Sequence, residues 1–317
     1  MNTNIRMKKI LALLICLSFS LASGLRAEQE LPAIVGRWDI VVHDPNGDFP
    51  SWLEVTLSGR HTLVGRFVAA FGSSRPVSQV FMENDKFNFS LPVQFENLPS
   101  DQWMKGTFVG DKISGTTLAY TGRTVSFEGQ RAPTLARNAP PVWGEPIELF
   151  DGKTLNGWHP RNAAPNRWIV KDGVLINQNS GTDLVSTRKF TDFKVHAEFR
   201  YPPGSNSGIY LRGRYEAQIE DNFGETADSH RIGGIYGFLQ PKVNAAKKAG
   251  EWQTYDITLV GRFVTVALNG VTVITEQEIP GITGGALDSN EGEPGPFFVQ
   301  GDHGPVEFRK FVVTPAR

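Results

Sequence analysis

Cysteine is almost absent from this sequence, which has one, Cys16, in 317 residues. If the segment around Cys16 is removed from the mature chain, no thiol is left, which excludes disulfide bonds and cysteine catalysis. Basic clusters are also lacking: 32 Lys and Arg residues balance 33 Asp and Glu residues, and no block is long enough to follow a phosphate backbone. Nucleic acid is therefore not an expected partner.

Long apolar runs are scarce, and the one at the N-terminus has the features of an export signal. Arg6, Lys8 and Lys9 precede the apolar run 10–22, and small residues follow it. This order is typical of a secretory signal peptide, here residues 1–27, although an uncleaved anchor helix is the alternative. Cleavage would remove four basic residues and no acidic one, leaving a net charge of -5. We expect a periplasmic or secreted protein without stable membrane insertion after cleavage.

The length predicts two domains, because single domains usually have about 150 residues. The prolines and small residues of the segment 133–144 favour an extended linker over a helix. We therefore expect a small antiparallel β domain at 30–132 and a second, larger domain at 145–317.

Short alternating segments recur in the first domain. Leu53, Val55 and Leu57 share one face against Trp52, Glu54 and Thr56, and similar patterns follow at 87–91 and 125–128. Strands with one buried face, separated by turns, indicate an antiparallel meander or small barrel. The opening Gly36-Arg37-Trp38 resembles the start of lipocalin-like barrels, but a core tryptophan without a ligand is the favoured interpretation.

The second domain is also rich in β-strand patterns, and its sequence shows no long amphipathic helix. Asn269-Gly270 separates two apolar runs, which is a strong hairpin signal. Two packed antiparallel sheets in a jelly roll fit this length. The expected strands are 192–200, 207–212, 215–220, 254–260 and 263–268.

Several motifs of the second domain resemble, in order, those of the 3-keto-disaccharide hydrolase family, also described as 3-keto-glucoside 1,2-lyases and 3-keto-2-hydroxy-glucal hydratases. They are PIELFDGKTLNGW at 146–158, WIVKDGVL at 168–175, NSGIYLR at 206–212, YEAQI at 215–219, GEWQTY at 250–255 and QGDHG at 300–304. The resemblance implies a concanavalin-like jelly roll that acts on oxidised (3-keto) disaccharides or glucosides. It does not extend to residues 30–132.

A ketone at C3 acidifies the C2 proton, so elimination can expel the C1 substituent, and water can then add to the glucal. This chemistry needs a base at C2, a donor or cation facing the enolate oxygen, and an acid or base at the leaving oxygen. His303, between Gly301 and Gly304, is the candidate proton carrier, because imidazole titrates near neutral pH. A solvated or structural histidine is the alternative, and His230 is kept in reserve.

The strand 215–220 places Glu216, Gln218 and Glu220 on one face, since side chains alternate along a strand. Such a stripe faces either solvent or a sugar. Arg212 is expected across the hairpin, where it could meet Glu216 or the enolate oxygen, and a structural Arg–Glu pair is the alternative. We predict His303, Glu216 and Arg212 as catalytic. The predicted substrate-binding residues are Asn206, Tyr210, Gln218, Asp221, Tyr236, Gln300 and Asp302.

Two other functions are weighed. A retaining glycosidase needs two carboxyls about 5 to 5.5 Å apart, whereas Glu216 and Glu220 are about 13 Å apart along a regular strand at ~3.3 Å per residue. A non-catalytic sugar-binding module is the second alternative, with Trp158, Trp168 and Trp252 as stacking platforms, unless these rings pack the core. No cofactor is certain, and a divalent cation such as Ca²⁺ stays open, because no spacing is diagnostic.

Overall fold

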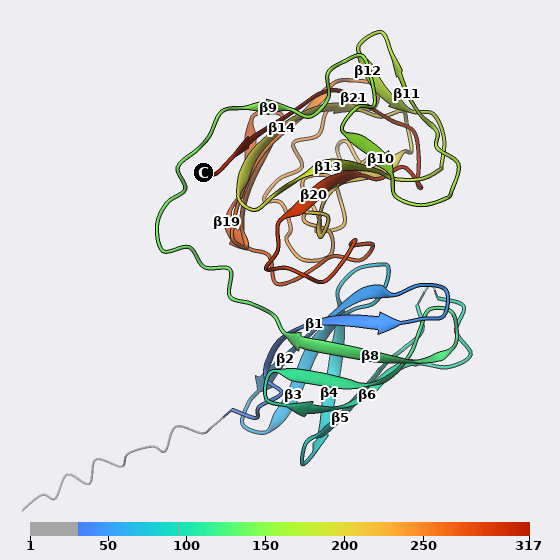
Figure 1. Cartoon of the computed structure of the whole chain (residues 1–317), viewed down its shortest axis with the longest axis vertical. Helices are drawn as coiled ribbons and strands as arrows, with labels where there is room; N and C mark the ends of the chain where they lie inside the picture. The colour runs from blue at the N-terminus through green and yellow to red at the C-terminus, as the bar shows by residue number, and fades with distance from the viewer. Residues whose placement is uncertain (1–30, 95) are drawn as a thin grey trace, which may run out of the picture. The chain divides into compact units, whose positions relative to one another are not determined.

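The computed structural model describes residues 31–94 and 96–317, so the predicted signal peptide lies outside the described residues. In this described part the chain forms strands and no helix (Figure 1). The strands are β1 (Gly36–His43), β2 (Phe49–Ser58), β3 (Thr62–Val68), β4 (Arg75–Glu83), β5 (Lys86–Leu91), β6 (Gln102–Val109), β7 (Lys112–Leu118), β8 (Thr124–Arg131), β9 (Ile147–Glu148), β10 (Trp158–Pro160), β11 (Trp168–Lys171), β12 (Val174–Asn177), β13 (Leu184–Phe190), β14 (Phe193–Arg200), β15 (Asn206–Leu211), β16 (Tyr215–Glu220), β17 (Gln253–Val260), β18 (Phe263–Leu268), β19 (Val271–Glu278), β20 (Gly295–Val299) and β21 (Val306–Pro315).

Strands β1 to β8 close into an antiparallel barrel in which each strand pairs with the next and β8 pairs with β1. The apolar side chains of the alternating segments fill its interior, where Leu53, Val55, Phe87 and Phe127 are buried together. Trp38 is fully buried and donates its indole N–H to the carbonyl oxygen of Ile34 at 2.9 Å. Trp38 is therefore a core residue of the barrel.

Trp52 departs from the prediction that the face opposite Leu53 is solvated. Its ring is fully buried and belongs to the apolar cluster of the second domain. It meets Phe238 edge to face at 5.4 Å, and a Cβ on Gly281 would lie 2.2 Å from its indole. The alternation identifies which side chains enter the barrel, but it does not reveal that the outer face of β2 is also covered.

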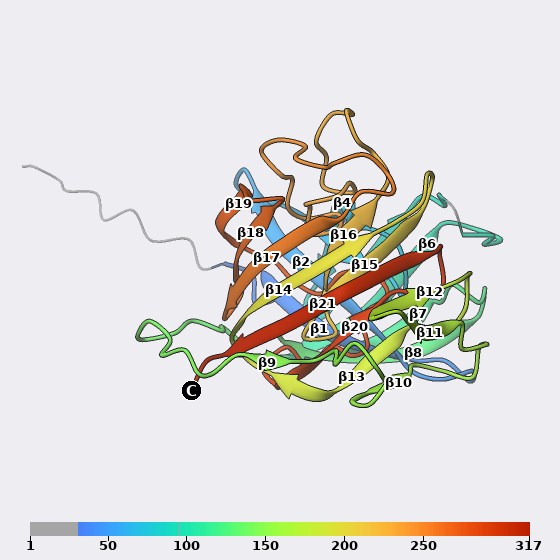
Figure 2. The same ribbon diagram turned by 90° about the horizontal axis from the view of Figure 1, so that it is seen from above.

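The second domain is a jelly-roll sandwich, so the protein is all-β, as predicted. Its smaller sheet has the order β10-β13-β20-β15-β16, and its larger sheet has the order β11-β12-β21-β14-β17-β18-β19, with β9 paired to β21. Figure 2 shows β17, β14 and β21 running side by side in the larger sheet. The hairpin predicted at Asn269-Gly270 joins β18 to β19, and both residues have positive φ, 53° and 79°, as a type I′ turn requires.

The tryptophans proposed as sugar platforms mostly serve the core. Trp158 and Trp168 are buried, and their indole N–H groups donate to the carbonyl oxygens of Leu149 at 2.6 Å and Thr182 at 2.9 Å. These two rings therefore pack in the apolar core and are not available as stacking platforms. Within the described residues we also find no helix with the length and hydropathy of a membrane span.

Candidate active site

Eight residues predicted from the sequence line one cavity of about 380 Å³. They are Asn206, Tyr210, Glu216, Gln218, Tyr236, Gln300, Asp302 and His303. A volume of this size lies within the usual range for small-molecule sites, about 300–1,000 Å³.

The cavity lies over β15 and β16, and the pairing of these strands explains which side chains reach it. Tyr210 is paired with Glu216, Gly208 with Gln218, and Asn206 with Glu220, so alternate residues of both strands share one face. Gln300 follows β20, the strand that pairs with the other edge of β15. Sheet geometry alone therefore gathers the polar groups that the sequence separates by up to about a hundred residues.

Gly208 makes room for the carboxyl group of Glu216. A Cβ at position 208 would lie 2.4 Å from Oε1 of Glu216, which is closer than such atoms approach in proteins. The glycine thus lets the carboxyl lie flat against β15, where it is buried while still lining the cavity.

Burial dominates the electrostatics of Glu216. Desolvation of the carboxylate raises its pKa to about 8, against the lowering influence of the hydrogen bond between Glu216 and Tyr210 and of the nearby His303. At neutral pH the carboxyl is therefore mostly protonated. A buried, protonated carboxyl in a cavity is suited to donate a proton to a bound molecule.

The hydroxyl of Tyr210 provides an independent argument for this proton. Its oxygen lies 2.8 Å from the carbonyl oxygen of Gly284 and 2.9 Å from Oε2 of Glu216. The hydroxyl has one proton, and the carbonyl can only accept. Both contacts are fully satisfied if Tyr210 donates to Gly284 and a protonated Glu216 donates to Tyr210.

His303 is the second titratable group of the cavity. Its Nδ1 lies 2.5 Å from Oδ1 of Asp302, and this hydrogen bond is the largest of the influences that raise the pKa of the imidazole, with Glu216 and Asp183 adding to it. The carboxylate fixes one ring nitrogen, which leaves Nε2 for a bound molecule. About half of the His303 side chain is exposed, so the imidazole can exchange protons with its surroundings.

Two amides of the cavity have oxygen atoms that lack partners. Oε1 of Gln218 and Oε1 of Gln300 are buried and accept no hydrogen bond from the described residues. An unsatisfied buried acceptor costs about 1–3 kcal/mol, so such atoms usually meet a ligand or water. Sugar hydroxyls are donors of the kind that would satisfy both.

Sequence reasoning missed Arg161 and Asp183, which also line the cavity. Nη1 of Arg161 donates to Oδ2 of Asp183 at 3.0 Å, and Nη2 donates to the carbonyl oxygen of Ala286 at 3.1 Å. Burial raises the pKa of Asp183, although the N–H of Gly301 and the guanidinium oppose it. Arg161 therefore supplies the cavity with a guanidinium held in a fixed position.

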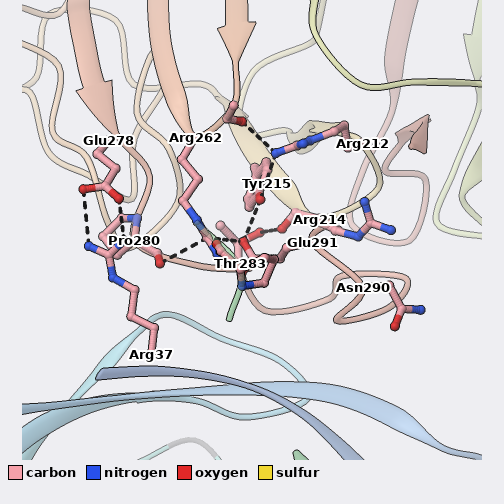
Figure 3. Close-up of polar contacts among 12 residues, drawn as sticks. Arg37, Arg212, Arg214, Tyr215, Arg262, Glu278, Pro280, Thr283, Asn290 and Glu291 are labelled. Carbon is pink, nitrogen blue, oxygen red and sulfur yellow. Dashed lines mark hydrogen bonds and ion pairs between the residues drawn. The ribbon is translucent and has the colours of Figure 1, made fainter. Parts of the chain in front are cut away.

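Arg212 does not lie where the sequence analysis placed it. Its φ of 53° puts it in the turn after β15, which ends the strand alternation one residue earlier. The side chain is fully buried and donates to the hydroxyl of Tyr215 at 3.0 Å and to the carbonyl oxygen of Gly261 at 2.8 Å (Figure 3). It belongs to a structural network around Glu291 and is absent from the lining of the cavity, so the expected contact with Glu216 is wrong.

Asp221 and His230 also lie outside the cavity. Oδ2 of Asp221 accepts the N–H of Gly204 at 2.8 Å, which stabilises the turn before β15. His230 lies 2.8 Å from Asp228 and lines an adjoining hollow that shares Asn206, Gln218 and Tyr236 with the cavity. In the part of the chain that the structure describes, no group of three or more His, Asp or Glu side chains could hold a metal ion.

The model of the 3-keto-α-glucoside-1,2-lyase-like domain matches residues 145–314, and the chain belongs to this family. A curated relative, a 3-keto-disaccharide hydrolase of Bacteroides thetaiotaomicron, is 33% identical over 75 residues, which cover 20% of this chain and 26% of the relative. The aligned part thus spans about a quarter of that protein.

Several solved structures are similar to about half of this chain. A Parabacteroides distasonis protein provisionally assigned as a glycosyl hydrolase is 30% identical, with a TM-score of 0.47, and the match covers 56% of this chain and 92% of that one. A carbohydrate-binding module of Bacillus subtilis is 12% identical, with a TM-score of 0.36, covering 50% of this chain and 95% of that one.

Proposed function

We propose that this protein cleaves 3-keto-glycosides by elimination and rehydration, with His303 and Glu216 as its acid–base pair. The observation that carries the proposal is the pairing, in one cavity, of a buried protonated carboxyl with an imidazole oriented by a carboxylate. The family assignment supports the substrate class, because its members are described as acting on sugars with a keto group at C3.

In the first half of the reaction, neutral His303 removes the proton from C2, and the electron pair moves into an enolate with the C3 oxygen. Arg161 replaces Arg212 as the cation that faces this oxygen. When the C3 carbonyl re-forms, a C1–C2 double bond forms and the C1–O bond breaks. Glu216 gives its proton to the departing oxygen.

In the second half the same two groups work in reverse. Glu216, now a carboxylate, takes a proton from a water molecule that adds to C1 of the glucal. The imidazolium of His303 returns a proton to C2. The net change is hydrolysis, and both groups regain their starting protonation states without any oxidant or reductant.

Incubation of the purified protein with a 3-keto-disaccharide and with its unoxidised parent tests the proposal. We expect release of the leaving sugar from the keto compound alone, and in D₂O we expect deuterium at C2 of the product. His303→Ala and Glu216→Gln should each lower turnover by about 10²- to 10⁴-fold. Cleavage without deuterium incorporation would remove C2 deprotonation from the mechanism.

A conventional glycosidase is the second candidate, because the cavity holds carboxyls other than the Glu216–Glu220 pair that the distance along the strand disfavours. Asp183 and Asp302 line it together with Glu216. Two carboxyls, one protonated, are the usual apparatus for hydrolysis of unoxidised glycosides. Comparable turnover of the unoxidised disaccharide, lost in both Glu216→Gln and Asp183→Asn, would favour this candidate over elimination.

We also propose that the protein is exported, on the strength of the charged and apolar start of the chain. N-terminal sequencing of protein from the cell envelope should find a chain that begins near Glu28. An intact Met1 on protein from the cytoplasm would contradict this.

A further inference from the structure

The loop between β3 and β4 brings residues of the barrel to the cavity of the second domain. Phe71 and Gly72 line the same cavity as Glu216 and His303. Residues 33–317 form one compact unit, so the barrel and the sandwich share this wall.

Glycines of the sandwich leave room for this loop. The N–H of Gly285 donates to the carbonyl oxygen of Ala70 at 2.8 Å. A Cβ on Gly284 would lie 2.1 Å from the carbonyl oxygen of Gly72, and a Cβ on Gly237 would lie 2.6 Å from Cβ of Ser73. Any side chain at these positions would push the loop away, which indicates a fitted contact.

Further contacts between the barrel and the sandwich stabilise this arrangement. Arg37 donates to Glu278 at 2.5 Å (Figure 3), and Trp52 is buried in the apolar cluster of the sandwich. The exposed ion pair contributes little by itself, whereas a buried tryptophan contributes several kcal/mol, on the order of 3 to 5 when truncated. The loop is therefore held at the cavity by packing at a distance from it.

Phe71 is the exposed aromatic ring of this wall. About half of its surface is open (52%), although the other residues that line the cavity are polar or glycine. Its ring lies edge to face with Tyr120 at 5.2 Å, and Tyr120 lies edge to face with Phe49 at 5.4 Å. The aromatic neighbours support one side of the Phe71 ring and leave another open, as in a stacking surface for a ligand.

The position of the proposed acid decides which part of the substrate meets this ring. The hydroxyl of Tyr210 contacts both Glu216 and the carbonyl oxygen of Gly284, and Gly284 lies directly against Gly72. The acid therefore lies on the side of the cavity nearest the barrel. Since the acid protonates the leaving oxygen, the group attached to that oxygen departs toward the loop.

We propose that Phe71 stacks on the leaving group of the substrate, so that the barrel sets leaving-group specificity. This inference rests on the proposed function, because it takes Glu216 as the acid at the leaving oxygen. It assigns the first domain a role in binding the second sugar of a 3-keto-disaccharide, whereas the 3-keto sugar itself is held by the sandwich.

The test compares two substrates that share the 3-keto sugar. One is a 3-keto-disaccharide, and the other is methyl 3-keto-glucoside, whose methyl group is too small to reach the ring. Aromatic contacts of this kind correspond to about two- to tenfold in affinity. For Phe71→Ala we expect kcat/KM to fall about three- to tenfold for the disaccharide, mainly through KM, and to change less than twofold for the methyl glycoside. Phe71→Trp should retain the disaccharide rate.

Phe81→Ala is the matched control, because Phe81 is an equally exposed phenylalanine (53%) on β4 that does not line the cavity. It should leave both substrates unchanged. A loss that is equal for the two substrates in Phe71→Ala, or no loss at all, would overturn the role of Phe71 while leaving the acid–base pair intact. Wild-type protein that cleaves neither keto substrate would overturn the proposed function and this inference with it.

Discussion

The buried proton of Glu216 gives a sharp prediction, because it ties activity and stability to the same group. Glu216→Gln keeps the shape of the protonated carboxyl: its amide can donate to Tyr210, which can still donate to Gly284. It removes the transferable proton, so we expect turnover to fall by about 10²- to 10⁴-fold. The fold should not suffer from this change.

Stability should instead increase in the variant, and the increase should depend on pH. Folding raises the pKa of Glu216 from an ordinary 4.5 to about 8, so the folded state holds a proton that the unfolded chain has released. Between these two values the wild type loses about 1.4 kcal/mol of unfolding free energy per pH unit through this group. The amide does not titrate, so the variant escapes this loss.

We therefore expect Glu216→Gln to gain about 2 to 3 kcal/mol over the wild type between pH 5 and pH 7. In thermal unfolding this corresponds to a widening gap of roughly 5 to 10 °C for a chain of this size. The comparison is repeated in a His303→Ala background, since the imidazole is coupled to the carboxyl. A stability difference that stays constant from pH 5 to pH 8 would refute the buried proton.

Three further predictions concern the neighbours of this group. Asp302→Asn removes the main cause of the raised pKa of His303. In a pH–rate profile, kcat/KM should therefore begin to rise at lower pH, because the imidazole loses its proton at lower pH. Arg161→Met should lower turnover about 10²- to 10³-fold in the folded fraction, whereas Arg212→Met should lower Tm and spare kcat in the folded fraction. Gly208→Ala should impair turnover more than it changes KM, because its Cβ would displace the carboxyl of the proposed acid, as steady-state kinetics would show.

Much of the cavity could be predicted because it is built on regular strands. Alternation along 215–220 identifies Glu216 and Gln218 as neighbours on one face, and the paired strand adds Asn206 and Tyr210. This inference needs local sequence alone, since the pleat fixes the direction of each side chain. The fold class could be predicted for the same reason.

The same argument fails where the strand ends. Arg212 continues the alternation in the sequence, but its positive φ places it in a turn and directs its guanidinium into the core. A change of backbone conformation at one residue thus makes an expected site residue a structural one. Gly213, which also has positive φ, indicates the turn in the sequence, because glycine favours this backbone conformation. Periodicity alone does not include this information.

Arg161 and Phe71 could not be found by any periodic argument, because each comes from a connection between strands. Arg161 is placed by Asp183 and by the carbonyl oxygen of Ala286, contacts that span 22 and 125 residues of sequence. Phe71 is placed by glycines of another domain, and the family match begins only at residue 145. In a site that combines strand faces with loops from two domains, only the residues on the strands are thus predictable from the sequence. Substitutions in the loops can change substrate specificity without disturbing the sheets.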